Sequence, residues 1–179
     1  MDNKTSSSGS YLRFFAMIAT AMVAMFFLMY TNSYQVLDHA WFSEERLFMT
    51  MIMGGSMMII MLAFMLQMYK RSKINIAIFI GGALLLIGSI WLSRSQATID
   101  DADYMEGMIP HHSIAILTSE RAGIEDPRVQ KLAKEIMDAQ RREIKEMEWL
   151  INDIRKNGIA ETEEEAKARP LPKFKPTSE

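Results

Sequence analysis

The chain contains no cysteine and only three histidines among its 179 residues. The lack of cysteine excludes disulfides, thiolate metal sites and cysteine catalysis, and it is compatible with an oxidising compartment without requiring one. The formal charge of −2 is too small to indicate nucleic-acid binding, and no basic, aromatic-rich surface is evident. The sequence also lacks a nucleophile paired with a base, a phosphate-binding loop and paired catalytic carboxylates. We therefore expect a protein that is not an enzyme and does not bind nucleic acid.

Long apolar runs dominate the first half of the chain. Three of them, residues 11–31, 46–69 and 74–92, are each close to the ~20 residues that a helix needs to cross a bilayer. The first run is too long for a secretory signal core and no small-residue cleavage site follows it, so we expect a retained helix. The sequence predicts a three-helix transmembrane region over residues 11–92, preceded by a disordered, serine-rich leader at residues 1–10.

Basic residues beside the short loops predict how these helices are oriented. Lys70, Arg71 and Lys73 lie in the tight turn between the second and third runs, whereas the loop between the first and second runs is acidic. Lysine and arginine favour cytoplasmic loops, so we expect a cytoplasmic N-terminus and an extracytoplasmic segment after the third run. In a bacterial inner (plasma) membrane, that segment would lie in the periplasm.

The second half of the chain has the pattern of two amphipathic helices. The first opens with acidic residues and stops at Gly123, while the second opens with Asp126 as a cap and Pro127 in its first turn and closes at Gly158. Apolar residues recur at three- and four-residue steps along the second helix. We therefore expect an all-α protein in which residues 98–158 form a soluble antiparallel helical hairpin.

A lone hairpin buries little apolar surface. We expect it to form a homo-oligomer, or to pack on the membrane region, so that a four-helix bundle is completed. The charged, proline-containing tail at residues 159–179 is expected to be flexible.

The segment "YMEGMIPHHS" at residues 104–113 concentrates potential metal ligands. Helical geometry places Asp101, Met105, Met108 and His112 in one narrow sector, whereas His111, one residue away from His112, points elsewhere. Thioether sulfur and imidazole nitrogen favour Cu(I), and equally Ag(I), over Mg²⁺ and Ca²⁺. The segment therefore predicts a soft-metal site.

Two considerations oppose a simple metal site. Pro110 removes a helical hydrogen bond and is expected to kink or break the helix, which would re-aim the histidines. Methionine at helical spacing is more often core filler than ligand. A structural or oligomerisation module that binds no metal is thus an alternative.

The segments "DADYMEGMIPHHSIAI" and "LAKEIMDAQRREIKEMEWL" resemble the bacterial family known as domain of unknown function 305, which includes periplasmic copper-binding proteins of the CopM type. The resemblance covers about residues 100–154. It implies a ferritin-like helical fold, copper binding through methionine and histidine, and a role in copper tolerance alongside a partner that delivers or receives copper. By position it points to Met105, Met108, His111 and His112 on the first segment and to Met137, Gln140, Glu143 and Met147 on the second. Thr118 departs from the family pattern, in which a methionine is frequent.

Three further features each allow two interpretations. Gln140 lies on the apolar face, where its amide could meet a histidine or a metal-bound water, or could set helix register. His39 lies in the extracytoplasmic loop beside Trp41 and could join the copper site or belong to an interfacial aromatic belt. Methionines at steps of four along the second run could form a Cu(I) ladder, as in a small copper transporter, or could fill gaps between helices.

The leading prediction is a membrane-anchored, extracytoplasmic Cu(I)-binding protein that sequesters or hands over copper. Met105, Met108, His111 and His112 are its predicted primary ligands, and Met137 or Met147 contributes.

Overall fold

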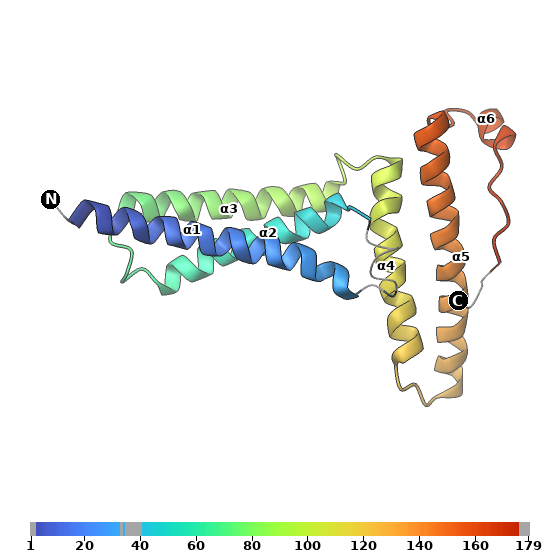
Figure 1. Cartoon of the computed structure of the whole chain (residues 1–179), viewed down its shortest axis with the longest axis horizontal. Helices are drawn as coiled ribbons and strands as arrows, with labels where there is room; N and C mark the ends of the chain where they lie inside the picture. Colours follow the sequence, from blue (N-terminus) through green and yellow to red (C-terminus); the bar gives the residue numbers. More distant parts are fainter. Residues whose placement is uncertain (1–2, 33, 35–40, 176–179) are drawn as a thin grey trace. The chain divides into compact units, whose positions relative to one another are not determined.

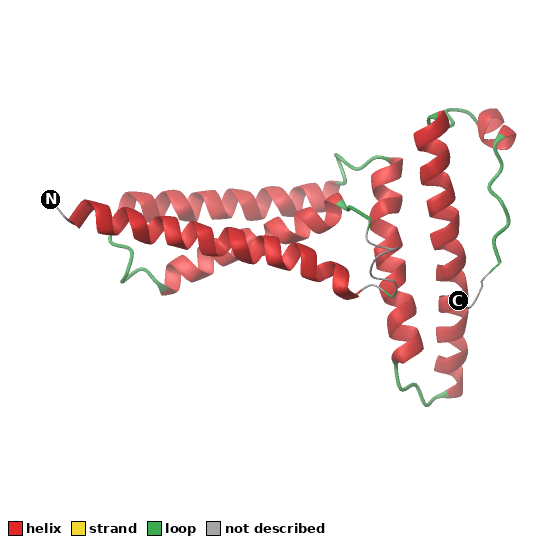
Figure 2. Cartoon of the chain, in the orientation of Figure 1, coloured by secondary structure: helices red, strands yellow, loops and turns green. Residues whose placement is uncertain are grey.

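The computed structural model describes residues 3–32, 34 and 41–175 of the chain. Every regular element within these residues is a helix, and no strand occurs among them (Figure 2). The chain divides into two compact units. We call Met1–Met29 with Glu44–Thr98 the membrane unit, and Tyr30–Ser43 with Ile99–Glu179 the α4–α5 unit.

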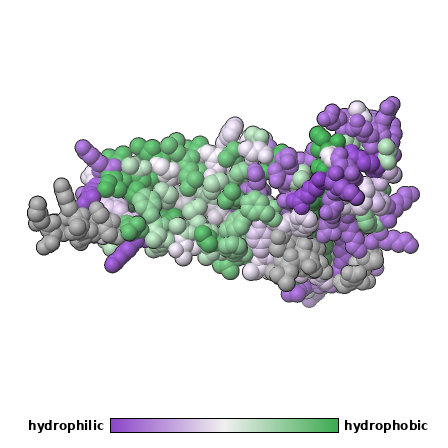
Figure 3. Space-filling view, turned by 45° about the horizontal axis from the view of Figure 1, so that its top comes forward, coloured by the Kyte–Doolittle hydropathy of each residue, from purple (hydrophilic) through white to green (hydrophobic). Residues whose placement is uncertain are grey.

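The membrane unit contains α1 (Asn3–Leu28), α2 (Glu44–Phe64) and α3 (Ser72–Ser95), and the short helix η1 (Met29–Asn32) follows α1. Three stretches are long and apolar enough to cross a membrane: Ser10–Thr31, Glu44–Phe64 and Ser72–Ser95. They match the three runs expected from the sequence. Hydrophobic side chains cover this unit's outer surface (Figure 3), including those of Phe27 and Trp91, as lipid-facing residues would.

The start of α1 differs from the sequence-based expectation. Residues 1–10 were expected to form a disordered leader, whereas α1 begins at Asn3. No proline interrupts residues 3–10, so the helix of the first apolar run can extend into the polar residues before it.

Packing of α2 against both α1 and α3 holds the membrane unit together (Figure 1). A cluster of buried residues from the three helices and the α2–α3 turn forms the core: Tyr11, Phe14, Ile18, Leu62, Tyr69 and Ile78. Gly55 and Gly82 bring α2 and α3 close, because a Cβ on Gly55 would lie only 3.0 Å from the Gly82 carbonyl oxygen. Small residues at such crossings allow the close backbone approach typical of membrane helices.

One polar network joins the helices at the basic turn between α2 and α3. The Tyr11 hydroxyl donates to Asn75 Oδ1 at 2.7 Å, and Asn75 Nδ2 donates to the Tyr69 carbonyl at 2.6 Å. The rings of Tyr11 and Tyr69 also pack with centroids 4.9 Å apart. These polar groups are paired with one another, as groups shielded from water require.

Helix α4 (Asp101–Arg121) starts at a reciprocal cap. The Asp100 side chain accepts from the Asp103 backbone N–H at 2.9 Å, and the Asp103 side chain accepts from the Asp100 N–H. The helix then runs through Pro110 without a break. Pro110 is fully buried, and its missing N–H leaves the Glu106 carbonyl without its usual helical donor.

Helix α5 (Pro127–Asn157) has the ends that the sequence predicts. The Asp126 side chain accepts from the Arg128 N–H at 2.8 Å, and Gly158 follows the helix with φ +79°. The tail was expected to be flexible, yet α6 (Glu163–Ala168) lies within it, started by Thr162 as its cap. Threonine accepting at an N-terminus next to acidic first-turn residues favours a short helix there.

Helices α4 and α5 lie side by side and share one apolar core (Figure 1). Its buried members are Met105, Ile109, Ile116, Ile144 and Ile151. Two residues of the segment that joins α1 to α2, Tyr34 and Trp41, pack against the same core. This segment, Tyr30–Ser43, therefore belongs structurally with α4 and α5 rather than with the helices that it connects in sequence.

Specific contacts hold the described part of this segment on the two helices. The Tyr34 backbone N–H donates to Ser113 Oγ at 2.6 Å, and the Arg155 guanidinium lies 5.5 Å from the centre of the Trp41 ring. A chain with three spans exposes its first loop and its C-terminal segment on the same side of a membrane. The shared packing agrees with that topology.

Candidate metal-binding site

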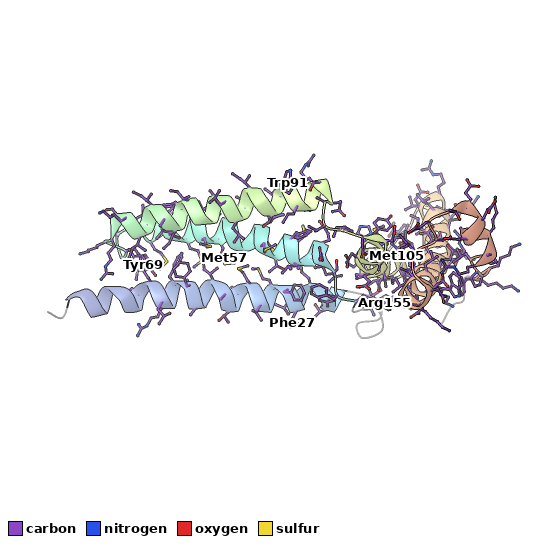
Figure 4. All side chains as sticks on the ribbon, turned by 90° about the horizontal axis from the view of Figure 1, so that it is seen from above. Phe27, Met57, Tyr69, Trp91, Met105 and Arg155 are labelled. Carbon is purple, nitrogen blue, oxygen red and sulfur yellow. The ribbon has the colours of Figure 1, made fainter. Side chains whose placement is uncertain are left out.

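Two methionines from different helices meet at one pocket of the α4–α5 unit. Met105 comes from α4 and is buried, and Met147 comes from α5 and is partly buried (Figure 4 labels Met105). Together they line a pocket of about 390 Å³. Its other lining residues are Asp101, Tyr104, Leu150, Ile154, Ile159 and Ala160. We call this the methionine pocket.

His112 lies on the same face of α4 as Met105, about two turns further along. Its Nδ1 is 2.9 Å from the Met108 carbonyl oxygen, and its Nε2 is 2.9 Å from Glu143 Oε2 on α5. A carbonyl oxygen can only accept, so Nδ1 carries a proton and Nε2 is the atom directed across the helix pair. Ligating histidines are commonly oriented in this way, with one ring nitrogen donating to a backbone carbonyl.

The adjacent histidines face different surroundings, as the helical angles predict. His112 is buried, whereas His111 is exposed, and their ring centroids are 6.1 Å apart. His111 therefore does not share the His112–Glu143 pair. Met108 lies between Met105 and His112 in sequence and is partly buried, so the first segment presents three potential ligands on one face.

The predicted ligands on α5 do not all gather at one place. Met147 lines the methionine pocket, but Met137 is ten residues away, or about 15 Å along a helix, and does not line it. Gln140 Oε1 is buried and has no hydrogen-bond partner in the part of the chain that the structure describes. Glu143, rather than Gln140, pairs with the histidine. Asp101 lies at the pocket, and His39 lies outside the described residues.

Within residues 3–32, 34 and 41–175, no group of three or more histidine, aspartate and glutamate side chains could hold a metal ion. Sites for Zn²⁺, Mg²⁺ or Ca²⁺ usually draw on such groups. The donors that line the methionine pocket are two thioethers and the Asp101 carboxylate, and the His112–Glu143 pair is not part of that lining. The two thioethers suit a soft cation better than a hard one.

A buried acid lies beside the pocket on the neighbouring face of α4. Glu106 is 7% exposed and is ion-paired with Arg155, the residue that contacts Trp41. Burial raises the pKa of Glu106 above its ordinary value, Arg155 opposes that rise, and the nearby charges of Asp103 and Asp100 add to it. Sequence patterns gave no sign of this pair, because its members lie on different helices.

Several pocket residues were not expected from the sequence. Leu150 and Ile154 continue the apolar face of α5, so periodicity could have found them. Ile159 and Ala160 follow Gly158 in a segment without periodicity, and no local signal places them at a pocket. The wall that they form depends on how the chain turns after α5.

Comparison with known proteins places this region in a family. A family model described as a domain of unknown function (DUF305) matches residues 101–173. The uncharacterized protein L153 of Acanthamoeba polyphaga mimivirus is 34% identical over 108 residues, which are 59% of this chain and 69% of that protein. No solved structure matches the chain at a significant level. The matched region includes α6 as well as α4 and α5.

Proposed function

The chain belongs to the family of the domain of unknown function 305, and from that premise we propose that it is a membrane-anchored, extracytoplasmic protein that binds Cu(I) and Ag(I). It sequesters copper or hands it to a partner protein, in the service of copper tolerance or homeostasis. It acts by binding and not as an enzyme. The observation that carries the proposal is the position of Met105 and Met147, which come from different helices and line one pocket.

Thioethers support this proposal through their chemistry. Methionine sulfur is a soft donor that carries no proton to lose, so it binds Cu(I) across a wide pH range and gives little affinity for hard cations. Met105 and Met147 are the primary ligands in our proposal, with Met108 one turn from Met105. We rank Met147 above His111 because Met147 lines the pocket. The sequence alone could not show which residues of α5 lie opposite Met105.

His112 is the proposed nitrogen ligand. Its Nδ1–H bond to the Met108 carbonyl holds the ring so that Nε2 points toward α5. A metal ion at Nε2 would take the place of the proton shared with Glu143, which then becomes a second ligand or an outer partner. His111 is exposed, so in this proposal it serves a separate, weaker site or none.

The test is competition between the full chain and a chromogenic Cu(I) chelator, in detergent or nanodiscs. Met105→Leu and Met147→Leu keep the volume and apolar character of each side chain but remove its sulfur. We expect each to weaken Cu(I) binding by about tenfold, since one ligand is lost from a small set. Met17→Leu, in the exposed part of α1, is the matched control and should bind as the wild type does.

Two outcomes would reject the proposal. One is a wild-type chain that fails to compete with the chelator at all. The other is binding that remains unchanged in both the Met105→Leu and the Met147→Leu proteins. The second outcome would favour the structural module, in which these methionines only fill the core.

An exposed apolar surface at the N-terminal end of α5 supports the proposed homo-oligomer. Val129 and Leu132 are 46% and 54% exposed, and they line a second, apolar pocket of about 240 Å³ with Ile124 and Ile136. Apolar residues that remain exposed on an otherwise amphipathic helix favour a second copy as the partner. Sedimentation of the detergent-solubilised chain would test this, and a Leu132→Glu protein should be monomeric.

Copper transport through the membrane unit is the weaker alternative. Met57, Met61 and Met65 pack against the apolar core of that unit, which accounts for them without a metal (Figure 4 labels Met57). We therefore assign binding to the α4–α5 unit alone.

A further inference from the structure

The chain after α5 folds back and forms one wall of the methionine pocket. Gly158 turns the chain with φ +79°, a left-handed conformation that glycine adopts without strain. The next two residues, Ile159 and Ala160, line the pocket together with Met105 and Met147. We call residues 159–169 the closing segment; its first two residues therefore lie at the pocket that holds these methionines.

One arginine fastens the end of the closing segment to α5. Arg169 Nη1 donates to Asp153 Oδ2 at 2.7 Å and to the Gly158 carbonyl oxygen at 3.2 Å. The side chains of Arg169 and Asp153 are only 26% and 16% exposed, so solvent screens this pair less than an exposed one. Arg169 thus ties the end of the segment to the turn at which the segment begins.

Short helix α6 makes the closing segment compact between these two points. Thr162 Oγ1 accepts from the Glu165 N–H at 3.2 Å, and Glu165 Oε2 accepts from the Glu161 N–H at 3.0 Å. These local bonds shorten the chain between Gly158 and Arg169. A single hydrogen-bonded ion pair can therefore decide whether Ile159 and Ala160 stay at the pocket or move away from it.

We propose that the closing segment is a latch, fastened by Arg169 on Asp153, that controls access to Met105 and Met147. For metal exchange, this inference rests on the proposed function, because the metal is taken to bind at those two sulfurs. With the latch closed, Ile159 and Ala160 shield bound Cu(I) from water and competing ligands. With the latch open, a partner's donor groups can reach the metal. Arg169 is a positioning residue and not a ligand.

The test measures access to sulfur and needs no metal. The metal-free full chain is exposed to dilute hydrogen peroxide, and sulfoxide formation at each methionine is followed by peptide mass spectrometry. We expect Arg169→Gln to speed oxidation of Met105 and Met147 roughly fivefold, the change expected when one partly exposed ion pair no longer opposes local opening. Met137, outside the pocket on the same helix, serves as the internal reference and should keep its rate.

The matched control is Arg128→Gln. Arg128 pairs with Asp126 at the opposite end of α5, and its side chain is 90% exposed. Met105 and Met147 of the Arg128→Gln protein should oxidise at the wild-type rates. Equal rates at Met105 and Met147 in the wild-type and Arg169→Gln proteins would overturn the latch. A matching rise at Met137 would overturn it too, because it would mean general loosening of α5.

A second variant covers the case in which Arg169→Gln does not fold. Ile159→Ala keeps the Arg169–Asp153 pair but removes most of the side chain that lines the pocket, and it should also speed oxidation of Met105 and Met147 selectively. If this protein folds and Met105 and Met147 oxidise no faster relative to Met137 than in the wild type, the latch is overturned as well.

Metal exchange provides the final comparison. Ag(I)-loaded Arg169→Gln should release the ion to an excess of chelator several times faster than the wild type, while the number of ions bound stays the same. Equal release rates would overturn the latch as a control of exchange. If the wild type binds no Ag(I), the proposed function fails, and the oxidation rates still decide whether the segment covers the pocket.

Discussion

Methionine occurs throughout both units, but its neighbours give it different roles. In the membrane unit, Met57, Met61 and Met65 pack against buried tyrosine, phenylalanine and leucine side chains. In the α4–α5 unit, Met105 and Met147 line a pocket whose rim carries Asp101 and Tyr104. Flexible thioethers fill gaps between apolar helices equally well in both settings. The second setting places two sulfurs and a carboxylate at one pocket, so helical spacing alone does not identify a ligand.

The two units also differ in how their helices are held. Close backbone contact at Gly55 and Gly82 joins α2 to α3. Side-chain pairs join α4 to α5, namely Glu106 with Arg155, His112 with Glu143 and Glu120 with Arg141. Lipid offers no hydrophobic force between helices, so close packing and paired polar groups such as Tyr11 and Asn75 must hold them, whereas α4 and α5 combine an apolar core with ion pairs. Substitutions should therefore act differently in the two units.

The largest contrast should come from a double substitution. Removing both pocket sulfurs with Met105→Leu and Met147→Leu should weaken Cu(I) binding by about 100-fold, the product of two tenfold losses. The same change at Met57 and Met61 should leave affinity as it is, because those sulfurs pack against the membrane core. Chelator competition on both double variants measures the contrast. A large loss from the Met57 and Met61 pair would remove the distinction between the units.

The next effect concerns glycine in the membrane unit. An added Cβ at Gly55 would lie 2.9 Å from the Leu86 backbone nitrogen, whereas one at Gly88 would have no neighbour within 4 Å. Gly55→Ala should therefore lower the free energy of unfolding by about 1–3 kcal/mol, as overpacking does, and Gly88→Ala should not lower it. Thermal unfolding in detergent compares the two. Equal stabilities would show that α2 and α3 do not approach as closely as the backbone indicates.

Sequence patterns anticipated the long helices and both ends of α5. Asp126, Pro127 and Gly158 bound α5 as expected, and helical angles separated His112 from His111. Both results follow from local rules, which depend on residues within one or two turns. The choice between Met137 and Met147 depends instead on how α4 and α5 align, and no local rule supplies that alignment.

The segments without periodicity were the least predictable parts. Tyr34 and Trp41 lie between the first two apolar runs, and only the folded chain places them on the α4–α5 core. Charge runs and prolines indicated a flexible tail, yet α6 lies there because Thr162 caps it and Arg169 bonds to Asp153. Contacts of this kind join distant positions, so composition and spacing cannot reveal them.

A moderate effect is expected where the α1–α2 segment meets α4. Ser113 Oγ accepts from the Tyr34 backbone N–H, so Ser113→Ala leaves that donor without its acceptor. We expect a loss of about 1 kcal/mol in the free energy of unfolding and faster hydrogen exchange at the Tyr34 amide. Ser119→Ala, on the same helix but at the other pocket, is the control. Unchanged exchange at Tyr34 would show that this hydrogen bond does not hold the segment.

The smallest expected effect is a pH dependence at Glu106, a buried acid of the α4–α5 unit. Its pKa is raised chiefly by burial, so the folded state binds the proton more tightly than the unfolded state does. Its contribution to stability is therefore present in full below the unfolded pKa and is lost as pH rises through the folded pKa. The amide side chain in the Glu106→Gln protein does not titrate. The unfolding temperature of the wild type, measured relative to that of the Glu106→Gln protein, should therefore rise as pH falls from neutral. A shift in the opposite direction would mean that the Arg155 ion pair, rather than burial, dominates at Glu106.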